Sequence, residues 1–400
     1  MEFGPIFRTL TRNKTRFILI SIEVALTLAI VVNCVNMVLS QRRQMMRETG
    51  IDEANIITIV SQPFAPDFKD KGYMDNARKA DVELLQSLPG AKAAAAISAF
   101  PLSGSGSSTG YKPLGAKINS IGTGYFESGM DILNSLGVRL IQGRNFTLDD
   151  FHEAKSKNII VTKAYADKLF PDGNALGKQV QGRTAENPHT IIGICETLTG
   201  SWPNWPNARH VTFFPDKPGD SNWGLRYVVR TEPGQVDDLI KTIEGKMLAL
   251  NGGRNVKLET LAEVKAETYQ SNRAIITMLS AVIGLLVFVT ALGIVGITSF
   301  SVTERTHHIG TRRALGARRV DILRYFLLEN WIITTLGLIL GVGATYGLNY
   351  ALVSWVDGEK LDWRLVVAGV GILWVTGLLA ALTPAARGAR VSPAIASRPA

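Results

Sequence analysis

The sequence predicts an α-helical membrane protein with four transmembrane helices and a large α/β extracytoplasmic (periplasmic) domain between helices 1 and 2. Three observations support this fold class. Four long stretches are strongly apolar, the excess positive charge is confined to three short segments, and residues 40–273 alternate between strand-like and helix-like patterns. Long apolar stretches are typical of membrane spans, and the alternation is typical of layered α/β domains.

Each of the four apolar stretches is long enough to cross a bilayer. A hydrocarbon core of ~30 Å needs roughly 20 helical residues at about 1.5 Å each. Lipid offers the backbone no hydrogen-bond partners, so each span must be helical. The first stretch follows basic residues, as in a signal peptide, but it is too long and "VLSQRRQ" lacks a small-x-small cleavage site, which predicts an uncleaved anchor. The spans are residues 17–39, 274–300, 331–353 and 365–386.

The distribution of charge predicts the orientation in the membrane. The formal net charge is +9, but residues 1–16, 301–324 and 387–400 together contain 13 Lys and Arg and three acidic residues. The rest of the chain is close to neutral, which argues against nucleic-acid binding. Four crossings put all three basic segments on one side, and the positive-inside rule makes that side the cytoplasm, with both termini.

This orientation predicts the division of the chain into segments. The patterns of residues 40–49 and 259–274 continue into the first two spans without Gly or Pro, so we expect helical stalk ends there. The segments are a cytoplasmic N-terminal segment (1–16), transmembrane helix 1 (17–39), a periplasmic core domain with stalk ends (40–273), transmembrane helix 2 (274–300), a cytoplasmic segment (301–326), transmembrane helix 3 (331–353), a short periplasmic loop (354–364), transmembrane helix 4 (365–386) and a cytoplasmic tail (387–400).

The periplasmic domain must fold on its hydrophobic core alone. Cys34 lies within the first span and Cys195 within the domain, so the two cannot form a useful bridge. Residues 103–110, "SGSGSSTG", have the composition of a flexible loop. Strand patterns occupy residues 55–60, 157–162, 189–195, 210–215, 225–231 and 255–260, and helix patterns occupy residues 163–170 and 235–250.

Several stretches resemble catalytic motifs but depart from them. "DGNALGKQ" (172–179) lacks the first Gly and the final Ser or Thr of a phosphate loop, and "HEAKS" (152–156) lacks the second His of a zinc site. "GSSTG" (106–110) matches G-x-S-x-G, but it lies in a Gly/Ser run before Pro113 rather than between a strand and a helix. We therefore predict no catalytic, cofactor-binding or metal-binding residues, with a Ser108 hydrolase as a minor alternative.

Three other features have more than one interpretation. Glu23 is the only charge inside a span, and we favour a role in helix packing over a function. The stretches "GLILG" (337–341) and "GATYG" (343–347) are small-xxx-small faces, which pack helices closely within one chain or between two. "SWPNWP" (201–206) is either an exposed partner contact or a folded hydrophobic corner.

The basic segment between the second and third spans carries a resemblance. Residues 304–329, "ERTHHIGTRRALGARRVDILRYFLLE", resemble the E-R-x-x-E-I-G-x-x-R-A-L-G-A signature of MacB/FtsX-type ABC transporter permeases. "LGVRLIQGRNFTLDD", "IIVTKAYADKLFPDGNALGKQV" and "YVVRTEPG" resemble the MacB-like periplasmic core domain, and "TPAARGARVSPAIASRP" resembles the end of these permeases. His308 stands where the family usually has Glu, which leaves open whether the chain pairs with itself or with a sister permease.

The resemblance implies a mechanical role. The basic segment would dock into a separate ABC ATPase (nucleotide-binding) subunit, where Arg312, Arg313, Arg318 and Arg319 could meet acidic groups. The chain would bind no cofactor, would lack a fused ATPase domain and would not be an enzyme by itself, while ATP and Mg would lie on the partner. The segment's expected coupling residues are Glu304, Arg305, Ile309, Gly310, Arg313, Ala314, Leu315, Gly316 and Ala317.

The resemblance also implies a task and partners. The expected task is export of peptides, antibiotics or similar amphiphiles across the bacterial inner (cytoplasmic) membrane, with a second permease subunit, a periplasmic adaptor and an outer-membrane channel. The alternative is a non-transporting FtsX-like signal transmitter that activates a periplasmic partner. The apolar residues Ala314, Leu315, Ala317, Val320 and Ile322 suggest a helix along the membrane surface, where the arginines would also contact anionic membrane lipid.

Overall fold

The computed structural model describes residues 14–151, 157–182, 188–216, 224–356 and 359–392. The described residues form two units, Met46–Gln270 and the helices that precede and follow it in the chain. Each unit is treated separately below. The "HEAKS" stretch, most of the basic N-terminal segment and the tail from residue 393 lie outside the described residues.

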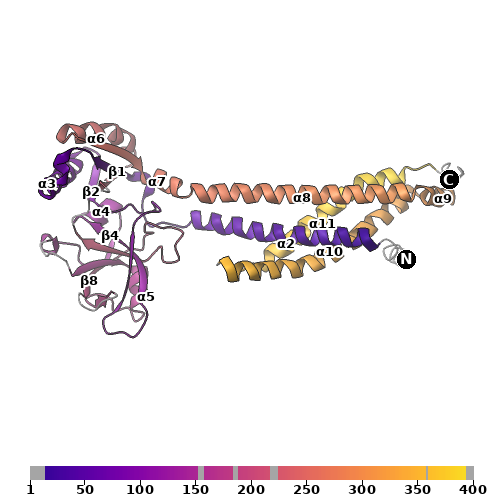
Figure 1. Ribbon diagram of the computed structural model, residues 1–400, viewed down its shortest axis with the longest axis horizontal. Coiled ribbons are helices and arrows are strands. Elements are labelled where there is room, and N and C mark those ends of the chain that lie inside the picture. Colours follow the sequence, from indigo (N-terminus) through magenta and orange to yellow (C-terminus); the bar gives the residue numbers. More distant parts are fainter. Residues whose placement is uncertain (1–13, 152–156, 183–187, 217–223, 357–358, 393–400) are drawn as a thin grey trace. The chain divides into compact units, whose positions relative to one another are not determined.

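The helical unit contains the four apolar helices that the sequence predicts (Figure 1). All four are long and apolar enough to cross a membrane, and each extends beyond the apolar stretch that predicts it. A shorter helix, α9, stands between the second and third of them. Their bounds are α2 (Lys14–Met45), α8 (Gln270–Glu304), α9 (Thr306–Ala314), α10 (Arg319–Val356) and α11 (Trp363–Ala389).

Glycines bring α10 into close contact with α2. A Cβ added to Gly341 would lie 3.0 Å from Ala25 Cα, and one added to Gly337 would lie 3.0 Å from the Ser21 carbonyl oxygen. Nothing would lie within 4 Å of a Cβ at Gly343. The first small-xxx-small face therefore packs within the chain, as such faces do in membranes.

We expect Gly341→Val to destabilise the helical unit by about 1–3 kcal/mol, because the new methyl groups would overlap the α2 backbone. Gly343→Val is the matched control, since its side chain would enter open space. Thermal unfolding of the purified protein in one detergent measures both variants. Equal melting temperatures for the two variants would contradict the assigned packing.

A polar network ties the loop after α10 to the helices. Asn36 and Asn349 donate hydrogen bonds to the Glu359 carbonyl oxygen over 3.2 and 3.3 Å. Asn349 also donates to the side-chain oxygen of Asn33. The side-chain N–H of Asn33 donates in turn to the Thr345 carbonyl oxygen over 3.1 Å. These amides satisfy one another and the loop backbone, which compensates for their removal from water.

The helix α8 has far less contact with the other spans. Apart from Asn272 near its start, its buried residues are Thr290, Ile294, Thr298 and Val302, which recur every four residues and form one row. Glu23 of α2 faces the same helix, because a Cβ at Gly293 would touch its carboxylate. The remaining faces of α8 expose large apolar side chains, among them Leu285 and Phe288.

Helices extend beyond both spans as expected, but neither continues unbroken through the whole predicted stalk end. The helix α2 ends at Met45, and α7 (Leu261–Thr268) is separated from α8 at Tyr269. A capping box starts α7 anew, since Thr260 accepts from the Glu263 N–H and the Glu263 carboxylate accepts from the Thr260 N–H. The buried Tyr269 ring sits at the break.

The α/β unit contains two sheets. The four-stranded sheet is antiparallel with the order β11-β1-β10-β2, and the seven-stranded mixed sheet has the order β5-β8-β6-β9-β4-β3-β7. The strands are β1 (Ile56–Pro63), β2 (Ala91–Ala96), β3 (Ser107–Pro113), β4 (Ile121–Ser128), β5 (Leu140–Gly143), β6 (Asn158–Thr162), β7 (Gln179–Gln181), β8 (His189–Cys195), β9 (Val211–Pro215), β10 (Leu225–Thr231) and β11 (Arg254–Thr260), and the other helices are α3 (Lys71–Ser87), α4 (Ile132–Leu136), α5 (Lys163–Leu169) and α6 (Val236–Leu250).

Each strand and helix pattern that the sequence analysis names in this unit corresponds to an element of the structure, but residues 103–110 are not simply a flexible loop. Ser107 and Ser108 begin β3, where Ser108 pairs with Gly124 of β4. Hydrogen bonds to β4 hold these residues in a strand, although their Gly/Ser-rich composition favours a loop. Ser108 therefore lies inside a strand and not on a strand-to-helix turn, so the structure lacks the context that the hydrolase alternative requires.

The stretch at residues 201–206 folds onto β4. The rings of Trp202 and Trp205 meet edge to face with centroids 5.9 Å apart, and both are half-buried. A Cβ at Gly122 would lie 3.2 Å from the Trp205 ring, so glycine there lets the ring approach the strand. This arrangement fits the folded hydrophobic corner rather than an exposed contact.

A buried ion pair connects the four-stranded sheet to α3. Arg254 donates to Asp81 over 2.8 Å, and neither side chain is exposed to solvent. Tyr227 donates to the same carboxylate over 2.6 Å. Arg254 also donates to the Met247 carbonyl oxygen of α6. Burial and the neighbouring Asp81 charge raise the pKa of Tyr227 well above its ordinary value, so its hydroxyl remains a donor.

Candidate functional site

The turn between α9 and α10, residues 315–318, presents an apolar side chain to solvent. Leu315 is 84% exposed, although leucine is usually buried. The turn depends on Gly316, whose φ is +98°, a conformation that other residues adopt only with strain. A Cβ at Gly316 would meet nothing within 4 Å, so backbone conformation and not space requires glycine.

Three arginines fix α9 to the neighbouring helices. Arg305 and Glu329 of α10 form an ion pair of 2.9 Å that is mostly shielded from solvent. Arg312 lies over the Tyr325 ring, 5.2 Å from its centroid. Arg313 donates to the Ala389 carbonyl oxygen at the end of α11 over 2.9 Å, where a cation complements the helix C-terminus. The turn therefore stands on a support tied to both α10 and α11.

The nine expected coupling residues separate into a buried group and an exposed group. Ile309 and Gly310 are buried, and Ile309 packs with Val302, Ile322 and Phe326. Ala317 is half-buried against the same cluster. Arg305 and Arg313 are half-buried in the contacts described above, whereas Glu304, Ala314, Leu315 and Gly316 are exposed. The exposed group is open to solvent, while the others contact the neighbouring helices to different extents.

The expected single helix along the membrane surface is interrupted. Residues 315–318 form a turn, and α10 begins after it at Arg319, where Asp321 in the first turn accepts a hydrogen bond from the Arg318 N–H over 2.8 Å. Ile322 is buried and Val320 is exposed, so they do not continue one apolar face. Around Leu315 the exposed surface is basic, with Arg312, Arg318, Arg319 and Arg324 on it.

Sequence reasoning missed the Arg305–Glu329 ion pair. The two residues are 24 positions apart, and their contact depends on the chain reversing between α9 and α10. The available signal was Glu329 itself, an acidic residue at the edge of an apolar span, whose burial requires a cationic partner.

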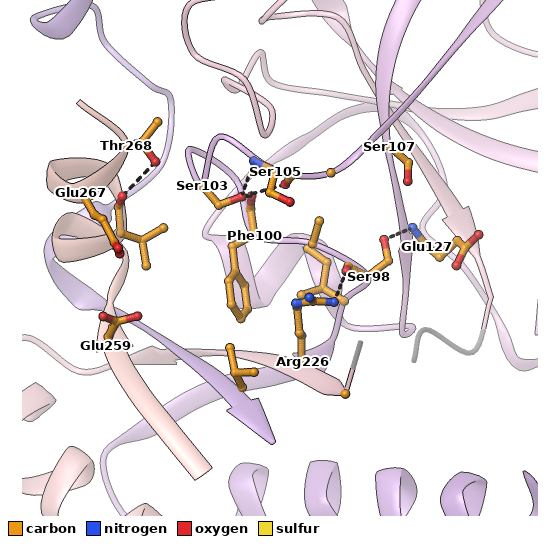
Figure 2. A pocket seen from close by; sticks show the side chains of 16 residues that line it. Ser98, Phe100, Ser103, Ser105, Ser107, Glu127, Arg226, Glu259, Glu267 and Thr268 are labelled. Carbon is orange, nitrogen blue, oxygen red and sulfur yellow. Dashed lines mark hydrogen bonds between the residues drawn. The ribbon is translucent and has the colours of Figure 1, made fainter. Parts of the chain in front are cut away.

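A second candidate site is a pocket of about 770 Å³ within the α/β unit (Figure 2). Its walls come from both sheets, from the loop after β2 and from α7. It combines the apolar side chains of Phe100 and Val264 with the charged groups of Glu127, Arg226 and Glu267. This lining can bind an amphiphilic molecule.

Two family models match the chain, and together they cover most of it. The MacB-like periplasmic core domain matches residues 23–243. The FtsX-like permease C-terminal domain matches residues 280–393, which include the α9–α10 turn.

Individual proteins show the same similarity. The macrolide export ATP-binding/permease protein MacB of Chromobacterium violaceum is 28% identical over 276 residues, covering 66% of this chain and 42% of that protein. The uncharacterized ABC transporter permease YknZ of Bacillus subtilis is 29% identical over 293 residues, covering 71% of this chain and 70% of that protein. This chain thus spans less than half of the first relative. The crystal structure of the periplasmic region of MacB from Actinobacillus actinomycetemcomitans aligns at 16% identity with a TM-score of 0.37, covering 56% of this chain and 98% of that one.

Proposed function

Because this chain belongs to the MacB/FtsX-like family of ABC transporter permeases, we propose that it transmits ATP-driven motion of a separate ATPase to a periplasmic domain that exports amphiphiles. It is a multi-pass membrane protein with four apolar helices. In the proposed orientation, both termini and the α9–α10 turn are cytoplasmic, and the α/β unit is periplasmic. The positive charge around the turn supports this orientation.

One observation carries the proposal: an exposed leucine stands on a rigid basic support. Leu315 offers a partner an apolar contact, and the surrounding arginines match acidic groups. The ties of Arg305 to α10 and of Arg313 to α11 prevent α9 from yielding alone when it is pushed. A push on the turn is therefore passed to both α10 and α11.

The chemistry of the proposed cycle resides in the partner. ATP and Mg would bind to the ABC ATPase subunit, and this chain would supply the docking surface and the moving helices. A second permease subunit, identical or related, would complete the membrane part. Membership in the ABC transporter permease family supports such pairing.

The proposed cargo is a peptide, an antibiotic or a similar amphiphile taken from the periplasm. The match of residues 23–243 to the MacB-like core domain, together with the pocket of about 770 Å³, supports export over pure signal transmission. An adaptor and an outer-membrane channel would extend the path outward.

Reconstitution in nanodiscs with the ATPase tests the proposal. We expect amphiphilic peptides or antibiotics to raise the ATPase rate, because cargo binding to the periplasmic domain is coupled to the nucleotide cycle. Stimulation by a cell-wall hydrolase alone, with no response to any amphiphile, would replace export with the signalling role.

A further inference from the structure

The pocket of the α/β unit has an apolar floor and a charged rim. Ile97, Phe100 and Val264 are buried and give the floor. Glu127 on β4 and Glu267 on α7 stand on opposite sides of Phe100 in Figure 2. The pocket thus places two carboxylates around one apolar surface.

The charges of the rim are unequal. Arg226 is the only cation among the described residues that line the pocket, and its guanidinium donates to the Ser98 carbonyl oxygen over 3.0 Å. Of the three lining carboxylates, Glu259 is paired with Lys257 over 2.9 Å. The carboxylates of Glu127 and Glu267 make no hydrogen bond or ion pair within the described part of the chain. With Glu259 paired, the lining has the carboxylates of Glu127 and Glu267 against the single guanidinium of Arg226, which is a formal excess of one negative charge.

We propose that this pocket binds an organic cation with an apolar body, such as a hydrophobic molecule bearing a protonated amine. The inference rests on the proposed function and names its cargo class. The apolar body covers Phe100 and Val264, and the ammonium group lies beside the half-buried carboxylate of Glu127, while the exposed Glu267 adds negative charge on the other side of Phe100. The partial burial of Glu127 strengthens this attraction relative to water. Val264 and Glu267 belong to α7, which precedes α8 directly in the chain, so the ligand contacts the segment that leads to the membrane.

The electrostatics of Glu127 give the binding a pH dependence. Burial and then the nearby Asp216 charge raise the pKa of Glu127 above its ordinary value. The other charged groups of the rim are Arg226, Glu267 and the paired Glu259. The contribution of Glu127 to the attraction is complete above its raised pKa and is lost as the pH falls through it. The affinity for the cation therefore decreases on acidification.

Two matched probes test the proposal on the full chain in nanodiscs. Phenylalanine 2-naphthylamide carries an ammonium group, and its N-acetyl derivative has the same apolar body without charge. Binding of each probe is measured by isothermal titration calorimetry, and the heat measured with empty nanodiscs is subtracted. We expect the cationic probe to bind at least about tenfold more tightly, the ratio that one modest ion-pair contribution corresponds to.

Variants locate the site. Glu127→Gln is expected to weaken binding of the cationic probe about tenfold, and Glu267→Gln, which changes an exposed side chain, by a smaller factor; both should leave the acetyl probe unchanged. Glu244→Gln, on the exposed face of α6 and away from the pocket, is the control. Equal binding of the two probes, no binding by the wild-type chain, or equal effects of all three variants would overturn the proposal. ATPase coupling is measured separately, so a pocket that fails while coupling persists leaves the proposed function intact, and the reverse result leaves the pocket intact.

Discussion

Replacing Leu315 with aspartate is expected to abolish stimulation of the partner ATPase without destabilising the protein. The side chain is 84% exposed in this chain, so its replacement removes no internal packing. Docking, in contrast, buries the leucine, which contributes about 1.5–3 kcal/mol, and a carboxylate in its place would be desolvated. Association with the ATPase should weaken at least about tenfold. Co-elution and cargo-stimulated ATP hydrolysis in nanodiscs measure the effect.

The controls for this prediction are in the same chain. Leu148→Asp changes an equally apolar and largely exposed residue in the α/β unit, and wild-type coupling is expected for it. Leu315→Met retains the apolar contact and should retain most of the coupling. If the ATPase reconstituted with Leu315→Asp responds to cargo as it does with the wild-type chain, the turn is not the docking point.

Replacing Asp81 with asparagine is expected to cost about 3–5 kcal/mol of folding free energy. Asp81 and Arg254 are completely buried, so the variant leaves an uncompensated guanidinium in the core. The same change also weakens the hydrogen bond from Tyr227. Urea unfolding of the full chain, followed by tryptophan fluorescence, reports the loss because the α/β unit contains Trp202 and Trp205.

A surface pair and a double variant complete this test. Asp238→Asn removes an exposed ion pair of 3.9 Å with Lys241 and should change stability by less than about 0.5 kcal/mol. The double variant Asp81→Leu with Arg254→Met should recover much of the loss, because apolar side chains replace both charges. A single Asp81→Asn variant as stable as the surface control would show that the buried pair is dispensable.

The apolar spans were predictable because lipid imposes one solution on a long apolar stretch. The α/β unit was less accessible to sequence reasoning. Residues 91–96, "AKAAAA", favour a helix by propensity, but they form β2 because β10 supplies hydrogen bonds and the four last alanines are buried. Tertiary context also converts the Ser/Gly-rich residues 107–110 into a strand.

The candidate sites show the same contrast. Leu315 and Gly316 stand next to each other in a short motif, so their pattern identified them directly. The Arg305–Glu329 tie depends on a reversal of the chain, and the pocket collects side chains from Val60 to Thr268. No local pattern brings such distant residues together, and only the fold reveals them.

The side of the membrane on which the α9–α10 turn lies tests the central claim most directly. The variants Leu315→Cys and Glu244→Cys each place a cysteine at an exposed position, the second of them in the α/β unit. A membrane-impermeant maleimide is applied to cells whose outer membrane is permeabilised and whose inner membrane is intact. The wild-type chain serves as the blank, since Cys195 is buried and Cys34 lies within α2. We expect the reagent to label the cysteine at position 244 in these cells. The cysteine at position 315 should be labelled only after the inner membrane is opened. Label at position 315 in intact cells would contradict docking to a cytoplasmic ATPase.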